Sequence, residues 1–503
     1  MIEKPHLMDT FNLDNLTFRR QFILTKDNVP QRVNWVTINM RHNFVLSVHP
    51  DLEYSVYTQD DQMICILGLV YSVVNPKWSG ETIVNYLGNC SKNIYEIIRN
   101  SKELGGRWVI IFQDDNETYL FNDPCGLRSI YYKQSVDETI CASQPTLINF
   151  HFPDTYRKDK DLLQFLGSTR RYKNESAWIG NKSVFSSCFR LLPNHFLRCS
   201  DGKVVRYFSI SEITKQDNVK DLVTEIVTIL HNSFSFLVEN YELKQALTSG
   251  YDSRLLLAAS RPNKERISYF VDRMGIYDIT HPDVWIPKIM SSSLDINFKV
   301  INSKHKLPDW FLLIYTNSVA LSRTLPKNRS IYTRLENAEN SVLINGNGSG
   351  IFKHVYDKKA SKYSELSSDV LAAIVNYENE GFVINELQQW IIDVDESDID
   401  KSSLLSLLYW EQRMGNWGAQ YPAESDIANE EISPFNNRLL IELFLSATDS
   451  YLLPPKYPLF RMIINDLWPE CLDYPFNPVI GGKQLISKVF RIPLKLKRLL
   501  VRK

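Results

Sequence analysis

A loop of small and polar residues stands between an apolar run and a helical pattern in the middle of the sequence. The apolar run ends at Leu247, small and polar residues follow at 248–253, and the leucines and alanines of 255–259 have a helical pattern. A strand, a tight loop and a helix in this order direct backbone N–H groups and the positive helix end toward an anion. The stretch 243–259 therefore predicts an anion site.

The residue types in this loop favour a nucleotide phosphate with a divalent cation. Gly250 would let the backbone approach a phosphate closely, and the hydroxyls of Thr248, Ser249 and Ser253 could donate to it. Asp252 would repel phosphates unless a cation lies between them, so we expect it to bind Mg²⁺. The alternative is an ordinary strand-to-helix turn in which Asp252 caps the helix. It is not a Walker loop, because no Gly-Lys-Ser/Thr follows.

A second glycine-rich loop follows a short apolar run at 342–344. It reads Gly346-Asn-Gly-Ser-Gly350, and Gly346, Asn347 and Gly348 are candidate nucleotide-binding residues. Taken alone, this loop is better explained as a flexible surface segment. Its position after a strand, together with the family resemblance given below, makes it a second candidate wall of the same site.

Composition limits the class of protein. The chain has 503 residues, enough for two or more domains with their own cores. Its 44% apolar content and formal net charge of −1 favour a soluble globular protein without general attraction to nucleic acid or acidic membranes. Seven scattered cysteines, with no C-x-x-C pair, argue against a disulfide framework or a zinc site and favour the cytoplasm. Neither a secretion signal nor an uninterrupted apolar run of membrane-spanning length is evident.

Residues 1–210 are predicted to form an α+β sandwich. A helical pattern covers 81–104, and the runs at 194–199 and 204–208 flank Ser200-Asp-Gly-Lys203, which is typical of a hairpin turn. The other strand candidates are apolar or alternating runs at 64–73, 108–112, 118–122 and 128–132.

Residues 218–480 are predicted to form a doubly wound α/β domain. An apolar-periodic helix at 219–240 precedes strand candidates at 243–247, 267–271 and 298–301, with helices between the strands. Such a parallel sheet binds its ligand at the carboxyl ends of its strands. The region from 360 to about 475 is predicted to be mostly helical.

A basic tail at 481–503 closes the sequence. Its last sixteen residues carry seven basic side chains among apolar ones. The tail could touch an acidic partner or a membrane surface, but a docked helix or a frayed end is the simpler interpretation, because Pro493 interrupts it.

The order of these parts resembles the asparagine synthetase family over nearly the whole chain. Asp123-Pro-Cys-Gly with Tyr131-Tyr132, and Leu191-Leu-Pro-Asn-His-Phe-Leu197, are similar to segments of the family's N-terminal glutaminase domain. Thr248-Ser-Gly-Tyr-Asp-Ser253 is similar to the Ser-Gly-Gly-x-Asp-Ser that opens its synthetase domain. Glu411-Gln-Arg and Ser433-Pro-Phe-Asn-Asn-Arg438 resemble two later regions. The resemblance implies an Ntn-hydrolase-like αββα sandwich followed by an N-type ATP pyrophosphatase domain of the adenine nucleotide α-hydrolase-like type.

Two departures from the family bear on chemistry. Family glutaminases use a cysteine directly after the initiator Met, but residue 2 here is Ile, and the first cysteine, Cys65, lies inside a predicted strand. We therefore expect no glutamine hydrolysis. The family's second loop, Gly-Asp-Gly-x-Asp-Glu, supplies a further acidic metal ligand, whereas Asn347 stands in that place here and no acid follows it.

Catalytic residues beyond the two loops are less strongly indicated. Amide-forming relatives use an acid near the attacking amine and a lysine near the transition state, and Glu378 and Lys456 lie in suitable regions. For each of them, an ordinary surface residue is the simpler interpretation. Asp283, in His281-Pro-Asp283, could orient a substrate or metal, but we expect it to cap the helix that begins there.

The resemblance implies an ATP-dependent, AMP-forming ligase that adenylates a carboxylate and forms an amide with ammonia or a substrate amine. Relatives that close β-lactam or lasso-peptide rings use an amine carried by the substrate, and natural-product or surface-polysaccharide synthesis would suit such an enzyme. The expected cofactors are ATP and Mg²⁺, and the expected partners are a small-molecule or peptide carboxylate and an amine, with a homodimer left open. The alternative is a catalytically degenerate binding or scaffold protein that retains the fold.

Overall fold

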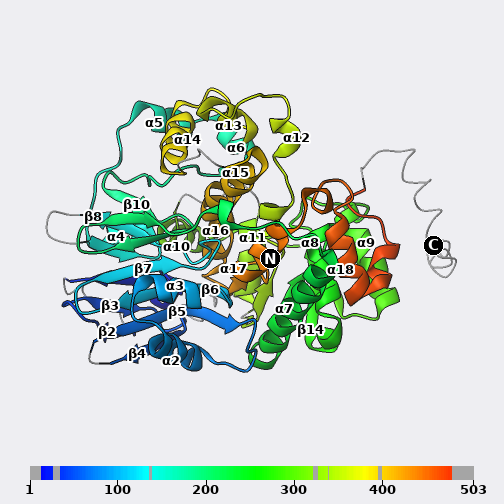
Figure 1. Ribbon diagram of the computed structural model, residues 1–503, viewed down its shortest axis with the longest axis horizontal. Helices are drawn as coiled ribbons and strands as arrows, with labels where there is room; N and C mark the ends of the chain where they lie inside the picture. Colours follow the sequence, from blue (N-terminus) through cyan, green and yellow to red (C-terminus); the bar gives the residue numbers. More distant parts are fainter. Residues whose placement is uncertain are drawn as a thin grey trace, which may run out of the picture.

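A computed structural model describes residues 13–26, 34–59, 61–134, 139–320, 327–337, 339–394 and 399–478 (Figure 1). The fold is mixed α/β, with two antiparallel sheets and one parallel sheet. The predicted basic tail and residue 2 lie outside the described residues.

The two antiparallel sheets lie face to face in the N-terminal half. One runs in the order β10 (Cys188–Arg190), β8 (Tyr131–Gln134), β9 (Thr139–Ala142), β1 (Phe22–Thr25), β3 (Val45–Val48) and β2 (Val36–Asn39). The other runs β12 (Lys203–Arg206), β11 (His195–Arg198), β7 (Thr118–Asn122), β6 (Leu104–Gln113), β5 (Met63–Ser72) and β4 (Tyr54–Thr58). Apolar side chains from both sheets, such as Leu46 and Ile111, form the core between them.

Helices cover the outer faces of this pair of sheets. A second apolar cluster joins β5 and β6 to α2 (Gly80–Cys90) and α3 (Ile94–Asn100), and a third joins β1, β8 and β9 to α4 (Pro145–His151). The sequence predicted one helical stretch at 81–104. The structure has two helices, because Ser91 is extended and Asn93 starts a new helix by accepting a hydrogen bond from the Glu96 amide. The predicted hairpin at Ser200–Lys203 is present between β11 and β12.

The parallel sheet of the C-terminal half has the order β15 (Phe298–Ile301), β14 (Ile267–Asp272), β13 (Leu243–Ala246), β16 (Val342–Ile344) and β17 (Glu431–Ile432). From β13 the chain continues to β14 and β15 on one side, whereas from β16 it continues to β17 on the other side. The strand order therefore reverses between the neighbouring strands β13 and β16. The helices before β16 are α7 (Val219–Asn240), α8 (Tyr251–Ala259), α9 (Pro282–Leu294), α10 (Asp309–Ser318) and α11 (Lys327–Glu336).

The described residues from 360 to about 475 are mostly helical, as the sequence predicted. The helices after β16 include α12 (Asp357–Ala360), α13 (Ser368–Ile374), α14 (Gly381–Val394), α15 (Lys401–Leu408), the π-helix η4 (Tyr409–Gly418), α16 (Ala419–Ser425), α17 (Arg438–Ser446) and α18 (Pro458–Leu467). Two short helices from the N-terminal half, α5 (Lys160–Leu166) and α6 (Thr169–Lys173), lie beside α13 and α14 at the top of Figure 1. Phe165 of α5 stacks on Phe382 of α14. The predicted domain boundaries stay a prediction.

Among the helices that the structure describes, α7 has the length and the apolar composition that a membrane-spanning helix requires. It packs against α8, α17 and α18, and 56% of its most apolar window is buried inside the protein. A buried core helix of a globular protein has the same properties, and the cytoplasmic location stays a prediction.

A buried cluster of charged side chains joins the antiparallel sheets to the parallel sheet. Arg107 of β6 makes a two-pronged contact with Asp426, at 2.5 and 2.7 Å, and Arg128 lies 2.7 Å from Glu430. Arg20 donates to the Asp426 carbonyl at 2.7 Å. Burial lowers the pKa of Arg107, but attraction to Asp426 and Glu430 outweighs it and holds that pKa above its ordinary value.

Removing one charge from this cluster should destabilise the protein strongly. Asp426→Asn leaves Arg107 with Glu430 as its remaining carboxylate partner, and removing one member of a buried ion pair costs about 3–5 kcal/mol. The measurement is the urea midpoint of the whole chain, followed by tryptophan fluorescence. Asp115→Asn breaks the exposed pair with Arg41 and serves as the control, which should leave the midpoint unchanged. Equal midpoints for both variants would contradict the importance of the cluster.

Candidate functional site

The two predicted loops meet at the carboxyl edge of the parallel sheet. The first loop, residues 247–253, follows β13, and the second loop, residues 345–353, follows β16, which is the neighbour of β13. A β-carbon built on Gly346 would lie 2.7 Å from the β-carbon of Asp252, so the loops touch and Gly346 has no room for a side chain. The strand order reverses at this point, which is where open α/β sheets bind ligands.

The first loop is organised by its own hydroxyls. Ser253 Oγ accepts from the Thr248 amide at 3.1 Å and lies 2.9 Å from Thr248 Oγ1. The Gly250 amide donates to Thr248 Oγ1 at 3.3 Å. Gly250 precedes α8 and provides no side-chain cap, so the first-turn N–H groups of that helix are left for an outside acceptor. Thr248 and Ser253 therefore shape the loop, and the N-terminus of α8 supplies the donors.

Asp283 contacts the first loop instead of capping its own helix. His281 is the N-cap of α9, and its ring accepts from the Asp283 amide. The Asp283 carboxylate accepts from the Ser249 amide at 2.9 Å and from the Ser249 hydroxyl at 2.6 Å. The expectation that Asp283 caps the helix is therefore wrong. The Asp283 carboxylate thus already accepts hydrogen bonds from the two Ser249 donors that the sequence predicted for a phosphate.

Asp252 is paired with a lysine from the second loop. Lys353 Nζ lies 2.8 and 2.9 Å from the two carboxylate oxygens of Asp252, and both side chains are partly exposed. Sequence reasoning missed Lys353. The available signal was a basic residue three positions after Gly350, opposite the lone acid of the first loop.

The second loop offers few ligands for a metal. The backbone N–H of Asn347 donates to Asn345 Oδ1 at 2.9 Å, and the backbone carbonyl of Asn347 accepts from Ser433 Oγ at 2.5 Å. Gly348 adopts φ +100°, a conformation that favours glycine, and lies close to Cys125 and Phe435. Within the described ranges, no group of three or more His, Cys, Asp or Glu side chains could hold a metal ion.

A C-terminal segment, residues 474–477, packs against the first loop. The Asn477 amide donates to the Ser249 carbonyl at 3.2 Å, and the Phe476 ring stacks on Tyr251 with centroids 4.0 Å apart. Arg254 is buried and donates to the carbonyls of Tyr474 and Pro475 at 2.7 and 3.0 Å. Burial lowers the pKa of Arg254 to about 10, so the group stays charged at neutral pH.

Lys456 and Glu378, the two predicted catalytic residues outside the loops, lie in different parts of the structure. Lys456 is exposed in the turn before α18, and that turn reaches the first loop, because Tyr251 donates its hydroxyl to the Pro455 carbonyl at 3.2 Å. Glu378 is exposed between α13 and α14, where its carboxylate lies 3.7 Å from Arg170 of α6. In Figure 1 these helices form the upper group, away from α8.

Two segments of the N-terminal half contact the chain after β17 and the π-helix η4. Asn436 donates to Asp123 at 2.7 Å and accepts from the Cys125 amide at 2.9 Å. Glu411 is fully buried and accepts from Asn194 at 2.9 Å and from the Trp390 indole at 2.7 Å. These side chains are held inside the protein and act as structural contacts between the two halves.

Comparison with known proteins gives little further guidance. No family model matches the chain, and no curated protein sequence matches it. Among solved structures, it is similar to a glutamine phosphoribosylpyrophosphate amidotransferase from B. subtilis complexed with ADP and GMP, at 10% identity and a TM-score of 0.23, covering 68% of this chain and 73% of that one. It is also similar to a structure described as the allosteric regulatory enzyme of purine biosynthesis, at 10% identity and a TM-score of 0.22, covering 67% and 72%. Such low TM-scores carry no argument about function.

Cys65 cannot serve as a glutaminase nucleophile in this fold. It is fully buried in β5, and burial raises the pKa of its thiol to about 12, so the reactive thiolate is absent at neutral pH. Burial also raises the pKa of Cys188 and Cys471 to about 12 and those of Cys125 and Cys199 well above the ordinary value. Cys90 is the one exposed cysteine of the seven, all of which the structure describes.

Iodoacetamide should therefore alkylate the folded protein at one position, Cys90, and the protein should release no glutamate from glutamine. Intact-mass and peptide mass spectrometry measure the first outcome, and an enzymatic glutamate assay measures the second. Cys90→Ser is the control and should abolish native alkylation. Glutamate release that disappears in Cys65→Ser would overturn this assignment.

Proposed function

We propose that this protein is an ATP-dependent, AMP-forming ligase that adenylates a carboxylate and joins it to ammonia or a substrate amine, without glutamine hydrolysis. The observation that carries the proposal is the pairing of the two loops at the switch point of the parallel sheet, where the N-terminus of α8 and the ammonium of Lys353 lie together. Both are positive, as a site for a polyphosphate requires.

The proposed reaction has two steps. A carboxylate oxygen of the substrate attacks the α-phosphorus of ATP, and pyrophosphate leaves with the electron pair of the broken P–O bond. The amine nitrogen then attacks the acyl carbon, AMP leaves, and the amine loses a proton. The proposed role of the first-turn amides of α8 and of Lys353 is to hold the phosphate charge that develops in the first step.

The residues around Asp252 do not fit a preformed magnesium site. Both carboxylate oxygens of Asp252 contact Lys353, and the second loop adds an amide, Asn347, in place of an acid. We therefore assign neutralisation of the phosphates to Lys353 and derive no step through Mg²⁺. Lys456 remains the proposed second lysine, because its turn contacts Tyr251. We do not carry Glu378 forward, because Arg170 pairs with it among helices away from α8.

A second candidate function is a catalytically degenerate binding protein. One specific feature favours it: the loop charges are neutralised by the chain itself, since Lys353 pairs with Asp252 and Asp283 accepts from Ser249. A nucleotide would have to displace these contacts. The two candidates therefore differ in whether ATP binds at all.

The Lys353→Met variant should weaken ATP binding about tenfold to a hundredfold, because a hydrogen bond to a charged group contributes about 1.5–3 kcal/mol. Calorimetric titration with ATP measures this, and pyrophosphate release with candidate acids and ammonia measures turnover. Lys358→Met changes an exposed lysine of the neighbouring α12 and is the matched control.

Two outcomes decide between the candidates. ATP binding that Lys353→Met weakens and Lys358→Met does not, with pyrophosphate release that Lys353→Met lowers in the same way, would support the ligase. A folded protein that binds no ATP at millimolar concentration would exclude the ligase and leave the degenerate binding protein.

A further inference from the structure

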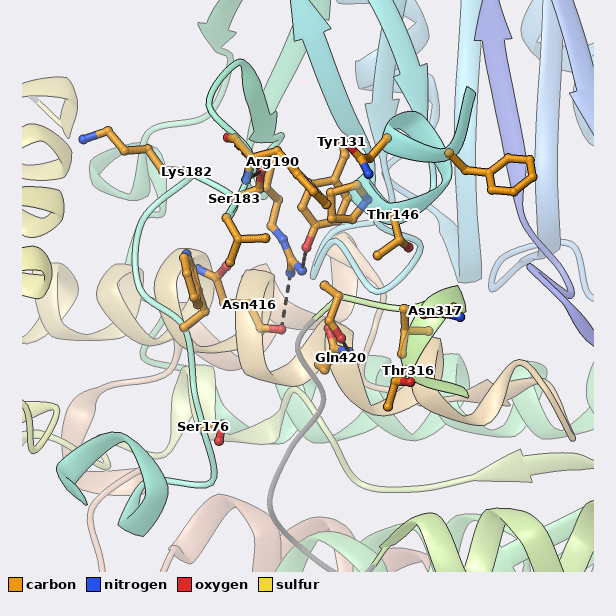
Figure 2. A pocket seen from close by; sticks show the side chains of 18 of the residues that line it. Tyr131, Thr146, Ser176, Lys182, Ser183, Arg190, Thr316, Asn317, Asn416 and Gln420 are labelled. Carbon is orange, nitrogen blue, oxygen red and sulfur yellow. Dashed lines mark hydrogen bonds between the residues drawn. The ribbon is translucent and has the colours of Figure 1, made fainter. Parts of the chain in front are cut away.

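A cavity of about 450 Å³ lies apart from the switch-point loops, where the antiparallel sheets meet the helical region (Figure 2). Its walls come from β8, α4 and β10 on one side, from the end of α10 on another, and from η4 and α16 on a third. Its volume falls within the range of about 300–1,000 Å³ that small-molecule sites occupy. The proposed ATP chemistry does not use it.

The cavity is positively charged. Its described lining contains two basic residues, Lys182 and Arg190, and no Asp or Glu. Lys182 is neutralised by Glu386, which lies 2.8 Å from its ammonium. Arg190 is 6% exposed, and no carboxylate of the described residues lies within 4.0 Å of its guanidinium. The net charge facing the cavity is therefore that of Arg190.

The Arg190 guanidinium is held by neutral groups on two of its three nitrogens. NH1 donates to the Gly415 carbonyl at 2.5 Å and to the Asn416 carbonyl at 3.3 Å, and NH2 donates to the Tyr131 hydroxyl. The guanidinium also stacks on the Tyr131 ring, 4.7 Å from its centroid. Figure 2 shows the side chain fixed between Tyr131 and Asn416. These contacts fix the orientation of the Arg190 guanidinium in the absence of a ligand.

This arrangement leaves two donors of the Arg190 guanidinium unused. Arginine has five N–H donors, and the contacts above account for three of them. Nε–H and the second proton of NH2 have no acceptor among the residues that the structure describes. These free donors can hydrogen-bond to the oxygens of a carboxylate.

The rest of the wall is aromatic and amide-bearing. Seven aromatic side chains contribute to the lining, and they are Phe18, Tyr131, Phe150, Tyr156, Trp178, Phe185 and Trp417. The amides Asn317 and Gln420 lie across the cavity from Arg190 in Figure 2. Aromatic walls bind flat apolar groups, and amides can donate to or accept from polar substituents on them.

We propose that this cavity binds a small aromatic carboxylate, with its carboxylate on the free N–H donors of Arg190 and its ring against the aromatic wall. The unused donors fix the anion, and the absence of acids from the described lining selects against cationic ligands. The site is separate from the two loops and does not depend on the proposed ligase activity.

The test uses the full-length protein and three probes: indole-3-acetate, benzoate, and indole-3-acetamide as the uncharged match of the first. Calorimetric titration should give saturable binding of at least one carboxylate, and the amide should bind more than tenfold more weakly. Trp178 and Trp417 line the cavity, so quenching of tryptophan fluorescence should follow the same curve. Asp252→Ala should leave this binding unchanged, which separates it from the ATP site.

Two variants test the geometry. Arg190→Lys keeps the charge but loses the planar guanidinium with its free donors, and it should weaken carboxylate binding about tenfold or more, a loss of about 1.4 kcal/mol. Thr146→Trp fills the cavity without breaking a side-chain hydrogen bond, because Thr146 Oγ1 has no partner, and it should abolish binding. Thr146→Val is its control and should bind like the parent. Absence of saturable binding by both carboxylates, or equal binding of indole-3-acetate to the Thr146→Trp variant, would overturn the proposal.

Discussion

The arrangement of this protein depends on the buried charge cluster of Arg20, Arg107, Arg128, Asp426 and Glu430. The arginines belong to the antiparallel sheets and their connections, while Asp426 and Glu430 directly precede β17. β17 pairs with β16, whose carboxyl end is the second loop. The cluster therefore sets the position of one wall of the candidate site. Burial opposes ionisation of Glu430, but Arg128 and Arg107 outweigh it and hold its pKa below the ordinary value.

The local sequence pattern correctly predicted most strands of the parallel sheet that carries the candidate site. β13, β14, β15 and β16 appear within about one residue of the predicted runs, because each is a short run that contains buried apolar residues and lies between helices. The parallel sheet with loops at its carboxyl edge followed from that alternation. β17 was not predicted, since it has two residues, Glu431 and Ile432, and so few residues carry no periodicity.

The contacts that decide the chemistry could not be predicted in the same way. Arg107 and Asp426 are 319 positions apart, and Asp252 and Lys353 are 101 positions apart. No spacing rule links such pairs, because only the folded sheet brings them together. Asp283 illustrates the same limit on a smaller scale: its place two residues after His281 is typical of a helix start, yet its carboxylate reaches the neighbouring loop. The Arg190 cavity also arises from segments far apart in the chain.

The first loop shows why a family-like motif does not by itself determine chemistry. Judged from the motif alone, the Asp252 carboxylate would bind a cation, and the Ser249 backbone N–H would bind an anion. In the folded protein Lys353 supplies the cation and Asp283 supplies the anion, both from this chain. A ligand must then compete with side chains that are already in place, and its binding free energy is reduced by the contacts it displaces. A nucleotide can do so if its phosphates take over the ammonium of Lys353, which leaves Asp252 in need of a new partner. The affinity of this site thus depends on how Asp252 is neutralised once Lys353 turns to the phosphates.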